Sequence, residues 1–192
     1  MRRRSFTLAK ALPVTEAPIG KVWSMDQLSL RVPTADLGYV SIMLGVDSKS
    51  KKKFICGLHG ETADDMRRAQ EKLRAFVRPY HGEIWRIKLD AHPSHRSIRL
   101  DDYLADTSTQ RQVAPGGVHE GVADVENVFM YGVPTANALL MAAPDLGEGH
   151  FYTAFTTFAA THDSAIIDSS DPPVSSDMMF YSWCRVKRKP TL

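Results

Sequence analysis

The order of its apolar segments is the feature that most constrains how this chain can fold, because three strand-like segments precede the first helix-like one. Side chains of residues 22–32 fall into two alternating sets, as on the two faces of a strand. Residues 38–46 form a nearly continuous apolar run, and residues 52–58 form a third short segment. A run such as 38–46 is typical of a buried central strand. Because the connections are too short for crossover helices, we expect the three strands to form an antiparallel meander.

The fourth segment has helical periodicity and clear end signals. Thr62 is a suitable N-cap, and two aspartates in the first turn suit the positive end of the helix dipole. Apolar side chains recur at helical spacing as far as Pro79 and Gly82, where we expect the helix to end. A strand at residues 84–90 follows. A strand reached across a helix is expected to lie parallel to its neighbour in a right-handed crossover.

The rest of the chain adds shorter elements. We expect a helix at 97–105, a strand at 109–114 and a helical region after 115–117, with Pro134 and Pro144 as breakers. Apolar helices at 136–143 and 148–161 and a closing strand at 178–186 complete the expected order. This order predicts an α/β protein with the RNase H-like fold: a mixed five-stranded sheet, made of the three-stranded antiparallel meander plus parallel strands, flanked by helices. We assign residues 20–186 to this domain, and residues 1–19 and 187–192 to basic tails.

Charge is distributed unevenly along the chain. Residues 112–184 contain nine acidic residues and no Lys or Arg, so their formal charge is −9. All 24 basic residues lie elsewhere, with the remaining 13 of the 22 acidic residues, which gives the rest of the chain +11. Such an asymmetry favours one surface suited to phosphate and another that repels it, unless the two stretches lie together in the folded chain.

Two carboxylates occupy positions that matter in an RNase H-like enzyme. Asp26 lies within the first predicted strand, and Asp90 ends the fourth. Enzymes of this fold hold two divalent cations with a few carboxylates, and Mg²⁺ prefers oxygen ligands. A charge within a strand is costly unless it is paired or binds a metal. Asp26 and Asp90 are therefore candidate metal ligands, although either could be an ordinary strand carboxylate.

Several motifs occur in a recognisable order. They are VWSMDQLSL around Asp26, GVDS after the second strand, IWRIKLD ending at Asp90, then APGGVHEGVADVEN, GVP at 132–134 and FYSWCRV at 180–186. Their order and spacing resemble the catalytic core of copia-type retrotransposon integrases, over roughly residues 20–190. The resemblance implies an RNase H-like fold and Mg²⁺-dependent catalysis, with Asp26 and Asp90 as the first two catalytic acids.

The resemblance leaves the third catalytic acid open. Alignment of the motif around it with the family's motif gives Asp124. The spacing usual in the family gives Glu126 instead, because 35 residues separate it from Asp90. Residues two apart on a helix point about 200° away from each other, so both cannot serve. The sequence also departs from the family pattern, because Ala91 and His92 follow Asp90 in place of Asn-Gly. In addition, no cation follows the third acid, where the family has basic residues that grip DNA.

Basic residues cluster elsewhere. One run lies at a predicted turn and strand start, where it could contact phosphate or form a solvated edge that blocks aggregation. Another lies near the C-terminus, and Arg2–Arg4 form a third patch. The candidate nucleic-acid-binding residues are Lys49, Lys51, Lys52, Lys53, Arg185, Lys187, Arg188 and Lys189.

These observations together predict a domesticated integrase-core-like protein with impaired catalysis. It would act as a structural or interaction subunit of a larger assembly, RNA-containing or organellar. The alternative is an active Mg²⁺-dependent DNA integrase or nuclease of a retrotransposon, with Mg²⁺ as cofactor only if the carboxylate site is intact. We expect protein or ribonucleoprotein partners, nucleic-acid contact through the basic termini and no membrane span. The basic N-terminus favours an intracellular location, in the mitochondrion or nucleus, over secretion.

Overall fold

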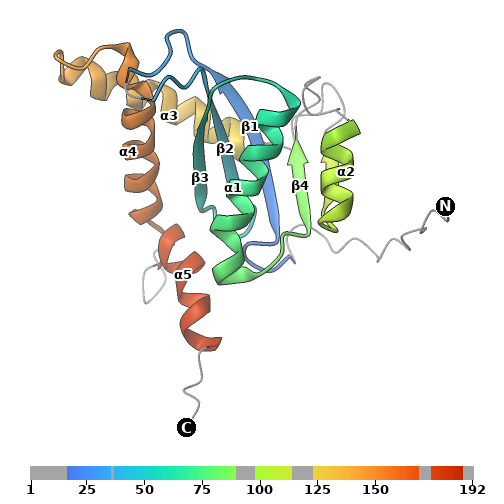
Figure 1. Cartoon of the computed structure of the whole chain (residues 1–192). Coiled ribbons are helices and arrows are strands. Elements are labelled where there is room, and N and C mark those ends of the chain that lie inside the picture. Colours follow the sequence, from blue (N-terminus) through green and yellow to red (C-terminus); the bar gives the residue numbers. More distant parts are fainter. Residues whose placement is uncertain (1–16, 36, 90–97, 114–122, 169–173, 188–192) are drawn as a thin grey trace.

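A five-stranded sheet with the strand order β3-β2-β1-β4-β5 lies at the centre of the molecule (Figure 1). The computed structural model describes residues 17–35, 37–89, 98–113, 123–168 and 174–187. The strands of the sheet are β1 (Val22–Ser29), β2 (Ser41–Asp47), β3 (Lys53–Leu58), β4 (Arg86–Leu89) and β5 (Gln110–Val113).

The pairing of these strands confirms the expected mixed sheet. β1 pairs antiparallel with β2, and β2 pairs antiparallel with β3, so the meander is present. β4 lies parallel to β1, and β5 lies parallel to β4. The β1–β4 ladder ends at the pair Met25 and Leu89, which are the residues immediately before Asp26 and Asp90 in the sequence.

Helices cover both faces of the sheet. In Figure 1, α1 crosses the front of the sheet, α3 lies behind β1 and β2, and α4 continues from α3 beside β3. A two-stranded ribbon joins α4 to α5. The bounds are α1 (Ala63–His81), α2 (Ile98–Asp106), α3 (Ala123–Ala142), η4 (Glu148–His150), α4 (Phe151–Ser164), β6 (Ile166–Asp168), β7 (Val174–Ser175) and α5 (Ser176–Lys187). Among the described residues, no helix is long and apolar enough to cross a membrane.

Alternation along the strands divides the core into two clusters. Trp23 and Met25 of β1 point toward α1, where they pack with the apolar stripe of that helix and with Phe180 of α5. Ile42 and Leu44 of β2 point to the opposite face, toward α3 and α4. Every residue of β2 is buried, as a continuous apolar run predicts for a central strand.

The start of α1 agrees with the prediction, but its end does not. Thr62 caps the helix, and its side chain and that of Asp65 form a reciprocal capping box. Pro79 does not stop the helix, which continues to His81 with Gly82 as its C-cap. Pro79 lies on the exposed side of the last turn, where water can hydrate the carbonyl that loses its N–H partner.

Two expectations for the C-terminal half are wrong. Pro134 does not separate two helices, because α3 runs through it from residue 123 to 142. Pro134 and Met130 both lie on the exposed side of α3, so the interrupted hydrogen bond faces solvent. The segment predicted as a closing strand is the helix α5. Its buried residues Ser176 and Phe180 are four apart, which is a helical spacing. The alternating apolar and polar residues of this segment had indicated a strand instead.

Candidate functional site

Asp26 lies on the face of the sheet that α3 covers. Its neighbours Trp23 and Met25 point to the opposite face, so Ser24 and Asp26 share the α3 side. The Asp26 side chain is half-buried, and its Oδ1 accepts a hydrogen bond from the backbone N–H of Gln27 at 2.7 Å. Asp90, the second predicted acid, lies outside the described residues.

The two candidates for the third acid both lie in the first turn of α3. Asp124 is bound by a cation of this chain, because Lys51 Nζ lies 2.8 Å from its Oδ1. Lys51 extends from the turn between β2 and β3, and about half of its side chain is exposed. Glu126 is half-buried in the same turn.

A second lysine, absent from the sequence prediction, lies on β4. Lys88 is paired in register with Ser24, on the α3 side of the sheet, and only 8% of it is exposed. Burial lowers the pKa of Lys88, and the positive charges of Arg86 and Lys51 lower it further, whereas Asp124 raises it. These three charges therefore lie within electrostatic range of Lys88.

Ser24 adds a polar group with no hydrogen-bond partner among the described residues. It is 1% exposed, and its Oγ is buried. The sequence does contain a signal for the position of Lys88, because Arg86 and Lys88 alternate with the apolar residues Ile87 and Leu89. Such alternation places the two cations on one face of β4.

A divalent-metal centre would need more carboxylates than the described part of this region brings together. Two-metal catalysis needs several carboxylates that converge on the cations. Among the described residues, no group of three or more potential ligands comes together to hold a metal ion. Instead, Lys51 forms an ion pair with one of the candidate acids, Asp124.

The lysine run that was a candidate for phosphate contact is largely engaged inside the protein. Lys53 Nζ lies 2.7 Å from Asp163 of α4, and both side chains are almost fully buried. Lys52 Nζ bridges Asp163 at 3.0 Å and Asp177 of α5 at 2.6 Å. Burial lowers the pKa of Lys52, but its acidic partners raise it by more, so the net shift is upward.

The exposed members of this run are Lys49 and Lys51. Near the C-terminus, Arg185 and Lys187 belong to α5, while Arg188 and Lys189 lie outside the described residues. The basic and acidic stretches of the sequence thus meet in space. Lysines of the β2–β3 hairpin hold the acidic residues of α3, α4 and α5.

The outer side of α3 is apolar where a DNA-binding helix would carry cations. No charged residue occurs between Glu126 and Asp145. The large apolar side chains exposed on this helix are Met130, Tyr131, Leu139 and Met141, of which Met141 is 83% exposed. A helix that is apolar on all sides normally has a partner on each of them.

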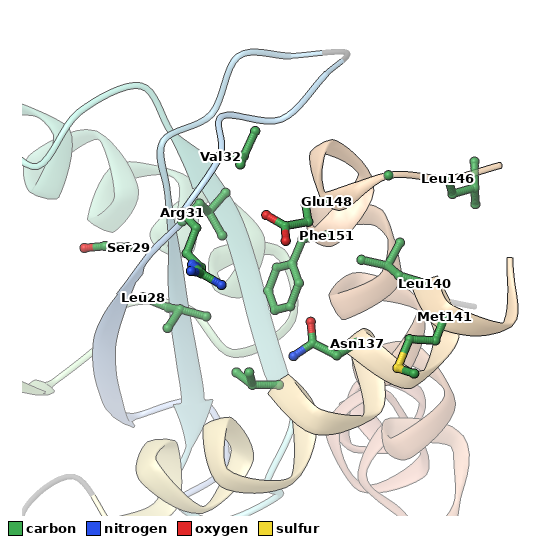
Figure 2. A pocket seen from close by; sticks show the side chains of 13 residues that line it. Leu28, Ser29, Arg31, Val32, Asn137, Leu140, Met141, Leu146, Glu148 and Phe151 are labelled. Carbon is green, nitrogen blue, oxygen red and sulfur yellow. The ribbon is translucent and has the colours of Figure 1, made fainter. Parts of the chain in front are cut away.

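Beside this surface is a cleft of about 700 Å³, which we call the α3 cleft. It lies between the C-terminal half of α3, the end of β1 and the start of α4 (Figure 2). Leu28, Leu140 and Phe151 contribute apolar lining, while Arg31 and Glu148 project into it. The cleft therefore extends the apolar outer side of α3 toward β1.

Comparisons with known proteins identify the fold. No family model and no curated protein matches the sequence. Solved structures match it over most of its length. A chain of the simian T-cell lymphotropic virus intasome, solved with a PP2A regulatory subunit, superposes with a TM-score of 0.69 at 12% identity. That match covers 91% of this chain but only 56% of the viral one, so this chain spans just over half its length.

Two isolated core domains match over almost their whole length. The HTLV-2 integrase catalytic core domain in complex with magnesium, in its dimeric form, gives a TM-score of 0.64 at 14% identity, covering 85% of this chain and 97% of that one. The BIV integrase catalytic core domain gives 0.63 at 11% identity, covering 88% and 99%. The chain has the fold of a retroviral integrase catalytic core, an RNase H-like fold.

Proposed function

We propose that this protein is a domesticated relative of copia-type integrases, which serves as a non-catalytic interaction subunit of a larger assembly. The observation that carries the proposal is the character of α3. In an integrase of this type the helix would present an acid to the metals and cations to DNA. Here its acid Asp124 is bound by Lys51, and its outer side is apolar and uncharged.

The ion pair of Asp124 with Lys51 supports the proposed loss of catalysis. An ammonium group can neutralise a carboxylate, but it cannot ligate the attacking water or act as a Lewis acid on phosphate. Lys51 pairs with one of the candidate acids, so a Mg²⁺ ion would have to displace it in order to ligate Asp124.

The outer side of α3 supports a protein partner. Polynucleotide binding draws most of its affinity from Lys and Arg that neutralise phosphates, and α3 offers none. Exposed side chains such as Tyr131 and Met141 are of the kinds enriched at protein interfaces. We propose that a partner protein covers this surface and extends into the α3 cleft.

The wider setting is also part of the proposal. The simian virus match was solved as an intasome with a further protein subunit. For this chain, we propose a protein or ribonucleoprotein assembly inside the cell, in the mitochondrion or nucleus. The basic residues 2–4 and 185–189 would contact its nucleic acid.

Site-specific crosslinking tests the proposed interface. A photoreactive residue at Met141 should form a covalent adduct with one discrete protein in the source cells. The same residue at Lys72, exposed on α1 across the sheet, serves as the matched control and should not. Leu139→Asp should abolish the adduct at position 141. Adducts of equal yield at both positions, unaffected by Leu139→Asp, would contradict the proposed surface.

A strand-transfer and nuclease assay tests the catalytic half of the proposal. With Mg²⁺ or Mn²⁺ and DNA ends, the wild-type protein should give no product above the level of Asp26→Asn. A metal-dependent product that disappears in Asp26→Asn would establish the alternative, an active integrase or nuclease.

A further inference from the structure

We propose that the α3 cleft binds an amphipathic helix of the partner protein, with an acidic residue on one flank of its apolar stripe and a basic residue on the other. The inference rests on the proposed function, because it specifies the chemistry of the partner that covers α3. The observation behind it is a pair of opposite charges, Arg31 and Glu148, which project into one apolar cleft from different elements.

The outer side of α3 has the spacing of a helix-packing surface. Its exposed residues include an uncharged series at intervals of three or four, namely Asn127, Tyr131, Pro134, Ala138 and Met141. At the rise of an α-helix this stripe is about 21 Å long. A second helix packed along the stripe would turn its own side chains at i, i+3, i+4 and i+7 toward α3.

The α3 cleft gives the side chains of such a helix a place to insert. Val32, Met141 and Leu146 line the cleft and are exposed, so an occupant would remove their apolar surface from water. The two walls are joined beside these residues. The backbone N–H of Ala35 donates to the carbonyl of Gly149 at 2.9 Å, and a Cβ on Gly149 would lie only 2.9 Å from that of Ala35. This contact fixes the spacing of the walls, and a preformed cleft loses less conformational freedom on binding.

Two charged side chains specify what can occupy the cleft. Arg31 follows β1, and Glu148 begins η4, so the charges come from opposite walls (Figure 2). Within the described parts of the chain, neither side chain forms an ion pair, with the other or with a third residue. Charges beside an apolar seam select opposite charges at the flanking positions of the partner helix. We therefore expect an acid facing Arg31 and a base facing Glu148, which also fixes the direction of the bound helix.

The test uses three synthetic stapled helices as probes, each of about 15 residues to match the stripe. All three share one apolar stripe. The mixed peptide has Glu on one flank and Lys on the other, whereas the acidic and basic peptides have Glu or Lys on both. Fluorescence anisotropy with the full chain gives each Kd. The mixed peptide should bind the wild type about three- to fivefold more tightly than the other two. In Glu148→Lys the acidic peptide should become the tightest binder, and in Arg31→Glu the basic peptide should.

Two further variants control for site and charge. Met141→Asp should weaken all three peptides by at least about tenfold, because a carboxylate then lies against their apolar stripe. Met141 is exposed, so this variant should fold normally. Lys72→Glu makes the same charge change as Arg31→Glu on an exposed position of α1, and should leave the order of affinities unchanged.

The other outcomes would each overturn the inference. These are no binding of any peptide, binding that Met141→Asp does not weaken, and one order of affinities in all variants. Dimerisation of the wild type in sedimentation experiments, lost in Met141→Asp, would assign the cleft to a second copy of the chain instead. If the photoreactive residue at Met141 still captured one discrete protein, the proposed function would stand without this inference, whereas loss of that adduct as well would remove both.

Discussion

Replacing Asp163 by Asn should destabilise the protein much more than replacing its partner Lys53 by Met. The two side chains are 2% and 1% exposed, and their charged atoms lie 2.7 Å apart. Without Asp163, the Lys53 ammonium group keeps His162 Nδ1, at 2.9 Å, as a neutral partner. Removing one partner of a buried pair costs about 3–5 kcal/mol, and we expect Asp163→Asn to fall in that range.

The loss for Lys53→Met should be smaller, about 1–2 kcal/mol, because the Asp163 carboxylate stays compensated. Lys52 Nζ remains 3.0 Å from it, and the backbone N–H of residue 53 still donates to it at 3.1 Å. The free energy of unfolding, measured with urea and circular dichroism, distinguishes the two variants. Arg67→Met, which breaks an exposed i,i+4 pair on α1, should cost under about 1 kcal/mol. Equal losses at positions 53 and 163, or a larger loss for Lys53→Met, would show that the Asp163 carboxylate is not compensated by Lys52 and the backbone.

Three further predictions concern other parts of the fold. Gly132→Ala should destabilise the α3–α4 packing by about 1–3 kcal/mol, although Ala favours helices, because its Cβ would lie 2.6 Å from the Phe158 ring; thermal melts check this. Burial raises the pKa of the Cys56 thiol from 9.0 to about 11. In a Cys184→Ser background, its alkylation at about pH 8 should therefore be roughly 100-fold slower than in the urea-unfolded chain. Burial, and then a neighbouring lysine charge, lowers the pKa of His162 below 6.5, so the folded state binds fewer protons than the unfolded state. Its stability contribution is then lost as pH falls below 6.5, and unfolding curves of His162→Gln should show a weaker pH dependence between about pH 7 and pH 5.

The strands of the sheet and α1 could be predicted because their signals are local. The apolar run of β2 needs both faces covered, and the capping box at Thr62 marks a helix start whatever the tertiary context. Pro134 and the segment around Phe180 could not be interpreted this way. Whether a proline interrupts a helix depends on which side faces water, and Phe180 is buried because α1 and β1 provide its pocket.

The candidate site was predictable only in part. Asp26 and Asp124 could be named from the order of elements and the integrase resemblance, and the structure places one on the sheet and the other on the helix that covers it. The partners of the lysines could not be predicted from the sequence. Lys52 and Lys53 look like a phosphate-binding run in sequence, because their partners Asp163 and Asp177 are more than a hundred residues away. Ion pairs between such distant segments form only once the sheet and helices have come together.

We propose that this integrase-like fold holds no catalytic metal, and Mn²⁺ binding tests that proposal directly. Electron paramagnetic resonance counts free Mn²⁺ as the ion is titrated into wild-type protein, with Asp26→Asn and Asp124→Asn alongside. We expect the wild type and both variants to show the same weak, non-saturating loss of free Mn²⁺ signal. Saturable binding to the wild type that disappears in both variants would contradict it, and would show an assembled carboxylate centre competent for Mg²⁺ chemistry.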